Sequence, residues 1–211
     1  MSKNSVGKVK QEQKYKILIR NLRKQQEEKD KNLKNRRKKI MKRLAIKKLI
    51  VISQSESRSL EIPFKNGLNI ILGGNKTGKS SIIKSIFTTF GCECKRIEKD
   101  WEKIISAYLL FFKYGERQFC IVRQDKKFQI FENINNDFSC IIETNAFHEY
   151  SNCLMDILEI KMPCISKDGK QFNITPPLLF RFQYIDQDEG WSKIADSFKN
   201  VAYIKDWKAN T

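Results

Sequence analysis

The feature that most constrains the fold of this chain is the loop motif Gly73-Gly74-Asn75-Lys76-Thr77-Gly78-Lys79-Ser80. The motif fits G-x-x-x-x-G-K-[ST] at every fixed position. The preceding run Leu68-Asn69-Ile70-Ile71-Leu72 is nearly continuously apolar, which is typical of a strand buried on both faces of a parallel sheet. Apolar residues then recur at helical spacing, at Ile82, Ile83, Ile86, Phe87 and Phe90. The order strand, glycine-rich loop and helix predicts an α/β fold of the P-loop NTPase type.

We expect this loop to bind the phosphates of a nucleotide, with Mg²⁺-ATP as the ligand. The glycines let the backbone curl so that successive N–H groups point inward, and the positive end of the following helix attracts anions. Lys79 would contact the β- and γ-phosphates, and the Ser80 hydroxyl would ligate the Mg²⁺ ion that bridges them. A chance glycine-lysine turn is the alternative, and the flanking strand and helix patterns argue against it. The expected nucleotide-binding residues are Gly73, Gly74, Asn75, Lys76, Thr77, Gly78, Lys79, Ser80 and Ser81.

Other motifs narrow the class of nucleotide-binding protein. A small GTPase would carry D-x-x-G and N-K-x-D sequences, and this sequence contains neither. A complete ATPase would also carry four apolar residues that end in Asp or Asp-Glu, the Walker B strand. The only Asp-Glu pair, Asp188-Glu189, follows Tyr184-Ile185-Asp186-Gln187 and does not fit that pattern. The sequence therefore indicates an ATPase that is incomplete as this chain alone.

The rest of the domain is expected to form an antiparallel sheet and a helix. Five further runs rich in β-branched and aromatic residues are bounded by polar turns. They lie at 49–52, 60–64, 107–113, 118–123 and 128–132, and the last three predict a meander. A helix is expected over 145–160, a left-handed helix cap at Gly91, and a strand over Leu178 to Ile185, after Pro176-Pro177.

The formal net charge of +17 is concentrated at the start of the chain. Residues 1–48 contain 19 Lys and Arg against 4 Asp and Glu, whereas residues 49–211 contain 22 against 20. Apolar residues are too sparse in the leader, residues 1–43, to form a continuous stripe, so we expect it to be helical or disordered. The P-loop half-domain is expected over 44–211. The leader would either bind the phosphates of a nucleic acid or remain a solvated tail.

Several other classes of protein are not expected from this sequence. No apolar run approaches the length of a membrane span, and the first residues lack the apolar core of a secretory signal. We therefore expect a cytoplasmic protein with no membrane partner and with reduced cysteines. The one close cysteine pair, Cys92-Glu-Cys94, has a shorter spacing than zinc-binding pairs, and the single histidine, His148, is distant in sequence.

The run from Leu44 to Gly91 resembles the N-terminal half-head of the SMC-like ABC-type ATPases. These include the double-strand-break-repair, RecN and RecF types and SMC-like ATPases of bacterial anti-phage defence such as the Lamassu kind. The resemblance implies an ABC-type head with an added antiparallel β meander, acting on DNA. It also implies a loop with a glutamine that senses Mg²⁺ and the attacking water. Gln187 is the candidate for that catalytic and metal-binding residue, and Asp186 is a candidate carboxylate.

The sequence also departs from this family in three respects. Lys76-Thr77 replaces the usual Gly-Ser or Gly-Ala, and residues 53–57 stand where an Asn-Phe-Arg stretch often contacts adenine. No signature motif or Walker B strand follows Gln187, whereas in the family these lie beyond a coiled-coil insertion. The resemblance therefore implies a second ATPase half, either on a longer form of the chain or in a homodimer. Two functions stay open: half of a composite ATP hydrolysis site, or a nucleic-acid-binding or adaptor protein that binds nucleotide without turnover.

Overall fold

The computed structural model describes residues 24–28, 42–95, 99–165, 169, 171–185 and 198–199. Internal contacts divide the chain into two units, Met1–Arg43 and Leu44–Thr211. Within the first unit, residues 24–28 are helical. All the elements described below belong to the second unit.

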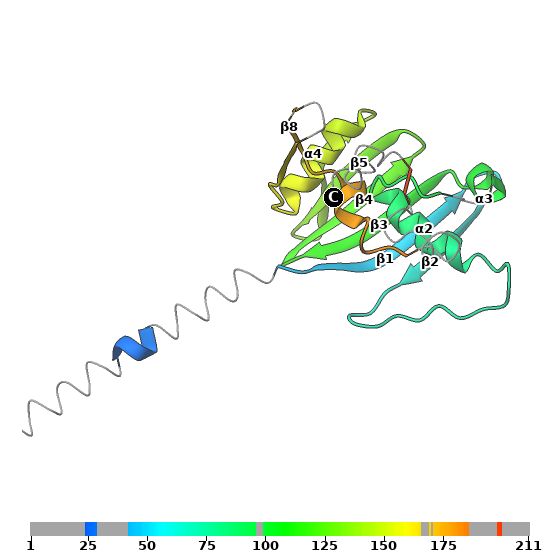
Figure 1. The fold of residues 1–211 in the computed structure, drawn as a ribbon. Coiled ribbons are helices and arrows are strands. Elements are labelled where there is room, and N and C mark those ends of the chain that lie inside the picture. Colours follow the sequence, from blue (N-terminus) through cyan, green and yellow to red (C-terminus); the bar gives the residue numbers. More distant parts are fainter. Residues whose placement is uncertain are drawn as a thin grey trace, which may run out of the picture. The chain divides into compact units, whose positions relative to one another are not determined.

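A six-stranded sheet, antiparallel throughout, forms the centre of the second unit (Figure 1). Its strand order is β2-β1-β3-β4-β5-β6. The bounds are Leu44–Ser53 for β1, Arg58–Pro63 for β2, Ala107–Tyr114 for β3, Arg117–Gln124 for β4, Lys127–Ile134 for β5 and Asp137–Thr144 for β6. The five strands expected from the sequence are thus present, and the meander is confirmed and extended by β6.

Two-residue turns connect the strands of the meander. The last of them, Asn135-Asn136, joins β5 to β6, and its residues have φ angles of 54° and 67°. Positive φ at both central residues suits a turn whose twist matches that of the flanking strands, and asparagine adopts this conformation more readily than most residues. This pair is the sequence signal from which β6 was predictable.

Four helices accompany the sheet in the described part of the second unit. They are α2 (Lys79–Thr89), α3 (Lys99–Ile104), α4 (Phe147–Ile157) and α5 (Pro176–Phe180). The expected helices after the loop and over 145–160 are confirmed as α2 and α4, and Gly91 has the expected left-handed φ of 85°. The strand expected over Leu178 to Ile185 is wrong. The chain forms α5 there because proline fits the first turn of a helix, where its missing N–H is not needed. A short antiparallel pair, β7 (Pro163–Ile165) and β8 (Gln171–Asn173), lies between α4 and α5 in sequence.

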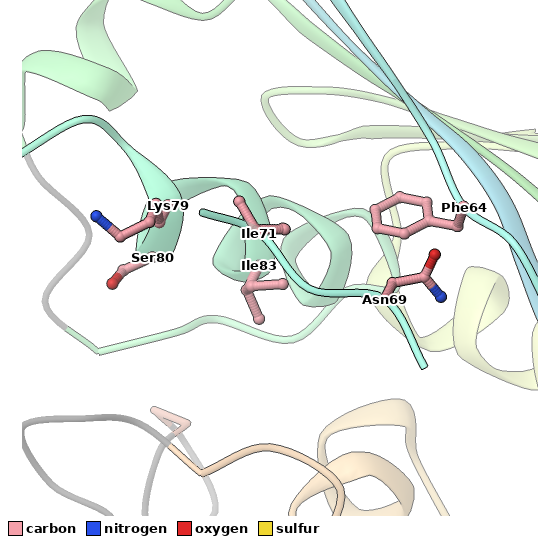
Figure 2. Close-up of a pocket in the computed structure, with 6 residues that line it drawn as sticks. All are labelled: Phe64, Asn69, Ile71, Lys79, Ser80 and Ile83. Carbon is pink, nitrogen blue, oxygen red and sulfur yellow. The ribbon is translucent and has the colours of Figure 1, made fainter. Parts of the chain in front are cut away.

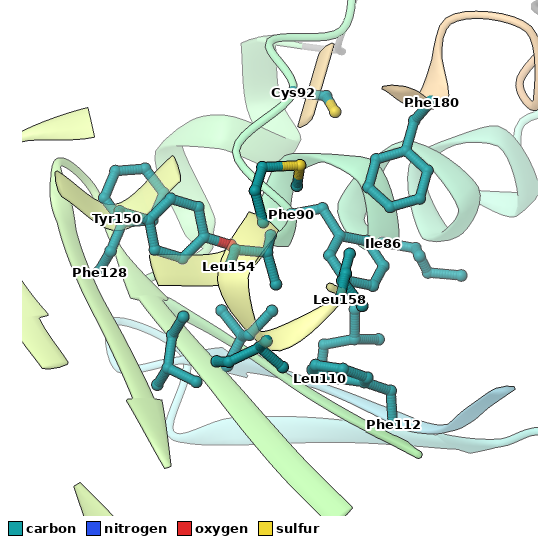
Figure 3. Close-up of a cluster of buried hydrophobic side chains, with 14 of the residues drawn as sticks. Ile86, Phe90, Cys92, Leu110, Phe112, Phe128, Tyr150, Leu154, Leu158 and Phe180 are labelled. Carbon is teal, nitrogen blue, oxygen red and sulfur yellow. The ribbon is translucent and has the colours of Figure 1, made fainter. Parts of the chain in front are cut away.

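The core lies on one face of the sheet, beneath α2 and α4 (Figure 3). A cross-strand row of fully buried residues runs through it, made of Leu49, Leu110, Ile121 and Ile130. Phe90 of α2 packs against this face, with its ring centroid 5.7 Å from that of Phe112 on β3 and 4.8 Å from that of Phe180 on α5. This packing fixes α2 on the sheet.

The strand expected over Leu68 to Leu72 does not form. The segment is irregular, and the side chains of Leu68, Ile70 and Leu72 are 86%, 70% and 87% exposed. A strand buried in a parallel sheet needs hydrogen-bonding neighbours on its edges. The described strands all pair antiparallel with one another, and none of them pairs with this segment. The parallel sheet of the expected fold therefore stays a prediction.

None of the helices among the described residues has both the length and the apolar character that crossing a membrane requires.

Candidate functional site

The C-terminal end of α2 is fixed by hydrogen bonds to the carbonyl groups of its last two residues. The Tyr150 hydroxyl donates to the carbonyl of Thr89 at 3.0 Å, and a guanidinium nitrogen of Arg123 donates to the carbonyl of Thr88. Burial raises the pKa of Tyr150 well above its usual range, so its hydroxyl keeps the proton that it donates. A cation at a helix C-terminus is also favourable for the helix dipole. α2 is thus held at one end while its other end meets the glycine-rich loop.

The N-terminal end of α2 has an unusual polar environment. Gly78 is the cap residue, with a left-handed φ of 81°, and no side chain caps the helix. The first turn contains no acidic residue and begins with Lys79. Ordinary helices start with a Ser, Thr, Asp or Asn cap and favour carboxylates in the first turn. This helix start combines uncapped N–H groups with a positive side chain, which is an environment suited to an anion.

Within the loop, the Lys79 side chain folds back onto the backbone. Its ammonium group donates to the carbonyl of Gly73 at 2.9 Å, to the carbonyl of Gly74, and to the Thr77 hydroxyl at 3.4 Å. The Thr77 hydroxyl in turn donates to the carbonyl of Gly74 at 2.9 Å. These bonds close the turn from Gly73 to Thr77 around the ammonium group.

Two of the glycines are required by this geometry. A Cβ atom on Gly73 would lie 2.7 Å from the Thr77 hydroxyl oxygen, which is closer than the two atoms can approach. Gly78 has a φ of 81°, a conformation that other residues adopt only with strain. Thr77, which departs from the family pattern, therefore leaves no space for a Cβ atom at Gly73.

The structure brings the nine predicted nucleotide-binding residues together at the start of α2. Asn75, Lys76, Thr77 and Ser80 are exposed, whereas Ser81 is buried on the helix. The two other candidates, Gln187 and Asp186, lie outside the described residues.

A pocket of about 350 Å³ adjoins the loop (Figure 2). Its lining residues are Phe64, Asn69, Ile71, Lys79, Ser80 and Ile83. In the close-up, Lys79 and Ser80 lie at one end of the pocket, and Phe64 and Asn69 lie at the other. Ile71 and Ile83 form apolar walls between them, so the pocket has polar groups at both ends and an apolar middle.

Asn69 organises the turn that leads into this pocket. Its side-chain oxygen accepts from the N–H of Lys65 at 2.9 Å, and its amide nitrogen donates to the carbonyls of Lys65 at 2.9 Å and Gly67 at 3.1 Å. The Lys47 ammonium group donates to the side-chain oxygen of Asn66 at 2.8 Å and ties the turn to β1. The start of the exposed segment is thus fixed, although the segment has no strand partner among the described residues.

Trp101 on α3 is a site residue that sequence reasoning missed, because the sequence favours a core or docking role for it. Its indole N–H donates to the Ser85 hydroxyl at 3.2 Å, and its ring lies 3.8 Å from where a Cβ atom on Gly78 would stand. The Ser85 hydroxyl donates to the carbonyl of Ser81 at 2.7 Å. Trp101 therefore supports both the first turns of α2 and the end of the loop. α3 lies in a charged stretch without apolar periodicity, so the sequence carried no signal for this contact.

All six cysteines are free thiols. Burial raises the pKa of Cys92 well above its usual range and that of Cys120 to about 12. In the described ranges, no group of three or more His, Cys, Asp or Glu side chains is placed to hold a metal ion. The polar groups at the loop are the hydroxyl, ammonium and N–H groups described above.

Comparison with known proteins shows that the chain is homologous to Lamassu protein LmuB. It is 30% identical over 164 residues to Lamassu protein LmuB of Bacillus cereus (strain VD014), an alignment that covers 76% of this chain and 28% of that protein. It is 29% identical over 131 residues to Lamassu protein LmuB of a Bacillus sp. strain, covering 61% of this chain and 22% of that protein. The chain thus spans less than a third of the length of either relative. No protein-family model matches the chain.

Proposed function

We propose that residues 73–81 bind Mg²⁺-ATP and that this chain contributes half of a composite ATP hydrolysis site. The protein would be an SMC-like, DNA-associated ATPase of cytoplasmic anti-phage defence. The observation that carries the proposal is the uncapped start of α2, where the GGNKTGKS loop places Lys79 and exposed N–H groups together.

The donors at this helix start match what a nucleotide phosphate chain requires. Phosphate oxygens accept hydrogen bonds from backbone N–H groups and ammonium groups, and the helix dipole adds to the attraction. The Lys79 ammonium group donates to the carbonyls of Gly73 and Gly74. When a nucleotide binds, it would exchange these carbonyls for phosphate oxygens. The exposed hydroxyl of Ser80, the next residue, would be the Mg²⁺ ligand.

The exposed segment from Leu68 to Leu72 supports the second part of the proposal. Its apolar side chains are exposed and its backbone pairs with none of the described strands, which leaves room for a parallel strand beside it. We propose that this strand comes from the second ATPase half, on a longer polypeptide or on another subunit. That half would also bring the Walker B carboxylate and the signature motif.

The chain's own residues would perform only part of the phosphoryl transfer. Transfer needs Mg²⁺, a positioned water and stabilisation of the charge on the γ-phosphate at the same time. Lys79 would bind the phosphates, Ser80 would hold the metal, and Gln187 would orient the attacking water. The remaining charge stabilisation would depend on the second half.

The homology to two Lamassu LmuB proteins supports a defence setting over a repair setting. The resemblance of the loop region to SMC-like ATPases does not decide between these two settings, because that family includes both repair and defence proteins. The aligned relatives are much longer than this chain, which agrees with a catalytic site completed by further sequence.

The test is ATP binding and phosphate release by the purified chain. We expect calorimetry to detect Mg²⁺-ATP binding, and we expect slow turnover that rises when a C-terminal segment with Walker B and signature motifs is added. Absence of ATP binding would overturn the proposal. Brisk turnover by the chain alone, lost in Lys79→Ala, would overturn the half-site claim, and Asp186 would be the first residue to mutate. ATP binding without turnover, both by the chain alone and with the C-terminal segment added, would favour the adaptor alternative.

Nucleic-acid binding by the leader is a second candidate activity, because residues 1–48 hold 19 basic and 4 acidic residues. We expect DNA affinity to fall steeply between low and physiological salt, with a logarithmic slope of about −0.9 for each phosphate neutralised. Deleting residues 1–40 is expected to remove most of this affinity and to flatten the slope. A truncated chain that binds DNA as tightly, with the same slope, would show that the leader is only a solvated tail.

A further inference from the structure

Lys76 has an unusual backbone conformation for its residue type. It stands within the phosphate-binding motif, between Asn75 and Thr77, with a φ of 59°. This left-handed region is uncommon for residues other than glycine, because the Cβ atom crowds the backbone. A glycine would adopt the same φ without a steric penalty. The backbone conformation at position 76 therefore favours glycine, yet the residue there is a lysine.

The two lysines of the loop have different surroundings. The Lys79 ammonium group donates to the carbonyls of Gly73 and Gly74, inside the turn. Lys76 is exposed, and its side chain makes no hydrogen bond or ion pair with any residue that the structure describes. The side chain therefore contributes nothing to holding the turn. Its charge is exposed to solvent and therefore accessible to a ligand.

We propose that Lys76 is a second phosphate-binding cation, whose ammonium group pairs with the terminal phosphate of a nucleoside triphosphate. This inference rests on the proposed ATP-binding function. Lys79 follows the cap residue of α2 and would contact the β- and γ-phosphates from inside the turn, whereas Lys76 lies on the exposed turn three residues earlier. A strained backbone at a binding loop is retained where the side chain that it presents has a use.

The pairing gives the loop a means of distinguishing ATP from ADP. The terminal phosphate of ATP carries the charge that Lys76 would neutralise, and ADP lacks that group. Lysine suits this role because its compact charge sits on a flexible four-carbon stem that can reach past the turn. The loop would thus hold the triphosphate with two cations and the diphosphate with one.

The experiment compares ATP and ADP affinities of the whole chain and three variants by calorimetry in Mg²⁺. Lys76→Gln removes the charge and keeps a flexible polar side chain, Lys76→Arg keeps the charge, and Lys126→Gln is a matched control on the exposed turn between β4 and β5. We expect Lys76→Gln to lower ATP affinity about tenfold and ADP affinity less than about threefold. Lys76→Arg and Lys126→Gln should both keep the wild-type preference for ATP over ADP.

An unchanged ratio of ATP to ADP affinity in Lys76→Gln would overturn the inference, provided that the wild-type chain binds ATP. A wild-type chain that does not bind ATP would instead overturn the proposed function itself. Lys76→Gly supplies the folding check, because relief of the positive φ should leave its urea midpoint equal to or above that of the wild type. A midpoint lowered by more than the flexibility that glycine adds to the unfolded chain accounts for would show that Lys76 stabilises the fold, and this too would overturn the proposed role.

Discussion

Replacing Lys79 with alanine is expected to reduce Mg²⁺-ATP affinity about ten- to a hundredfold. The variant loses charge-assisted hydrogen bonds to the phosphates, which are worth about 1.5–3 kcal/mol in proteins. It also loses the bonds from the ammonium group to the carbonyls of Gly73 and Gly74, which close the turn in the structure. Titration calorimetry of the variant and the wild type measures the difference directly.

The control for this prediction is Lys126→Ala, which removes an exposed lysine from a turn of the meander. Its affinity for Mg²⁺-ATP should equal that of the wild type. If Lys79→Ala also binds ATP with unchanged affinity, residues 73–80 do not form a nucleotide-binding loop. Urea unfolding of each variant separates loss of binding from loss of structure.

Replacing Phe90 with alanine is expected to lower the free energy of unfolding by about 3–5 kcal/mol. The side chain is 1% exposed at the end of α2 and lies between the aromatic rings of Phe112 and Phe180. Its removal leaves a cavity where the helix meets the sheet, and the rigid strands beneath can close only part of it. Chemical denaturation with urea, followed by circular dichroism, measures the loss.

Phe138→Ala supplies the matched control on β6. Its ring is 43% exposed and lies 6.0 Å, between centroids, from that of Phe111. We expect this variant to lose about 1–2 kcal/mol, less than Phe90→Ala, since nearly half of the residue stays exposed to water and its removal leaves no enclosed cavity. A larger loss for Phe138→Ala than for Phe90→Ala would contradict the described position of the core.

The elements that sequence reasoning predicted correctly are those whose pattern is complete within a few residues. The period of the apolar residues after Ser80 suffices for α2, and runs rich in β-branched and aromatic residues between polar turns suffice for β3, β4 and β5. The run from Leu68 to Leu72 has an equally clear pattern, but a parallel strand also requires neighbours that local sequence does not contain. The aromatic run after Pro177 misled for a different reason, since its apolar side chains serve a short helix as well as a strand.

The candidate site was also predictable only where its pattern is complete within a few consecutive residues. Residues 73–81 are contiguous, so the motif alone predicted that they would gather at a helix start. Two features of the site depend on the three-dimensional path of the chain, namely the contact of Trp101 with Ser85 and the φ of Lys76. The spacing of residues along the sequence does not predict either of them. The role of Gln187 stays a prediction, since that residue lies outside the described part of the chain.

The exposed segment from Leu68 to Leu72 also has a consequence for how this chain behaves in solution. Three large aliphatic side chains, each at least 70% exposed, stand on an irregular segment that pairs with none of the described strands. Such a segment is a template for self-association between identical chains. Without a strand to cover it, the protein will tend to aggregate as its concentration rises. Co-production with the covering strand should therefore raise the yield of soluble, monodisperse protein.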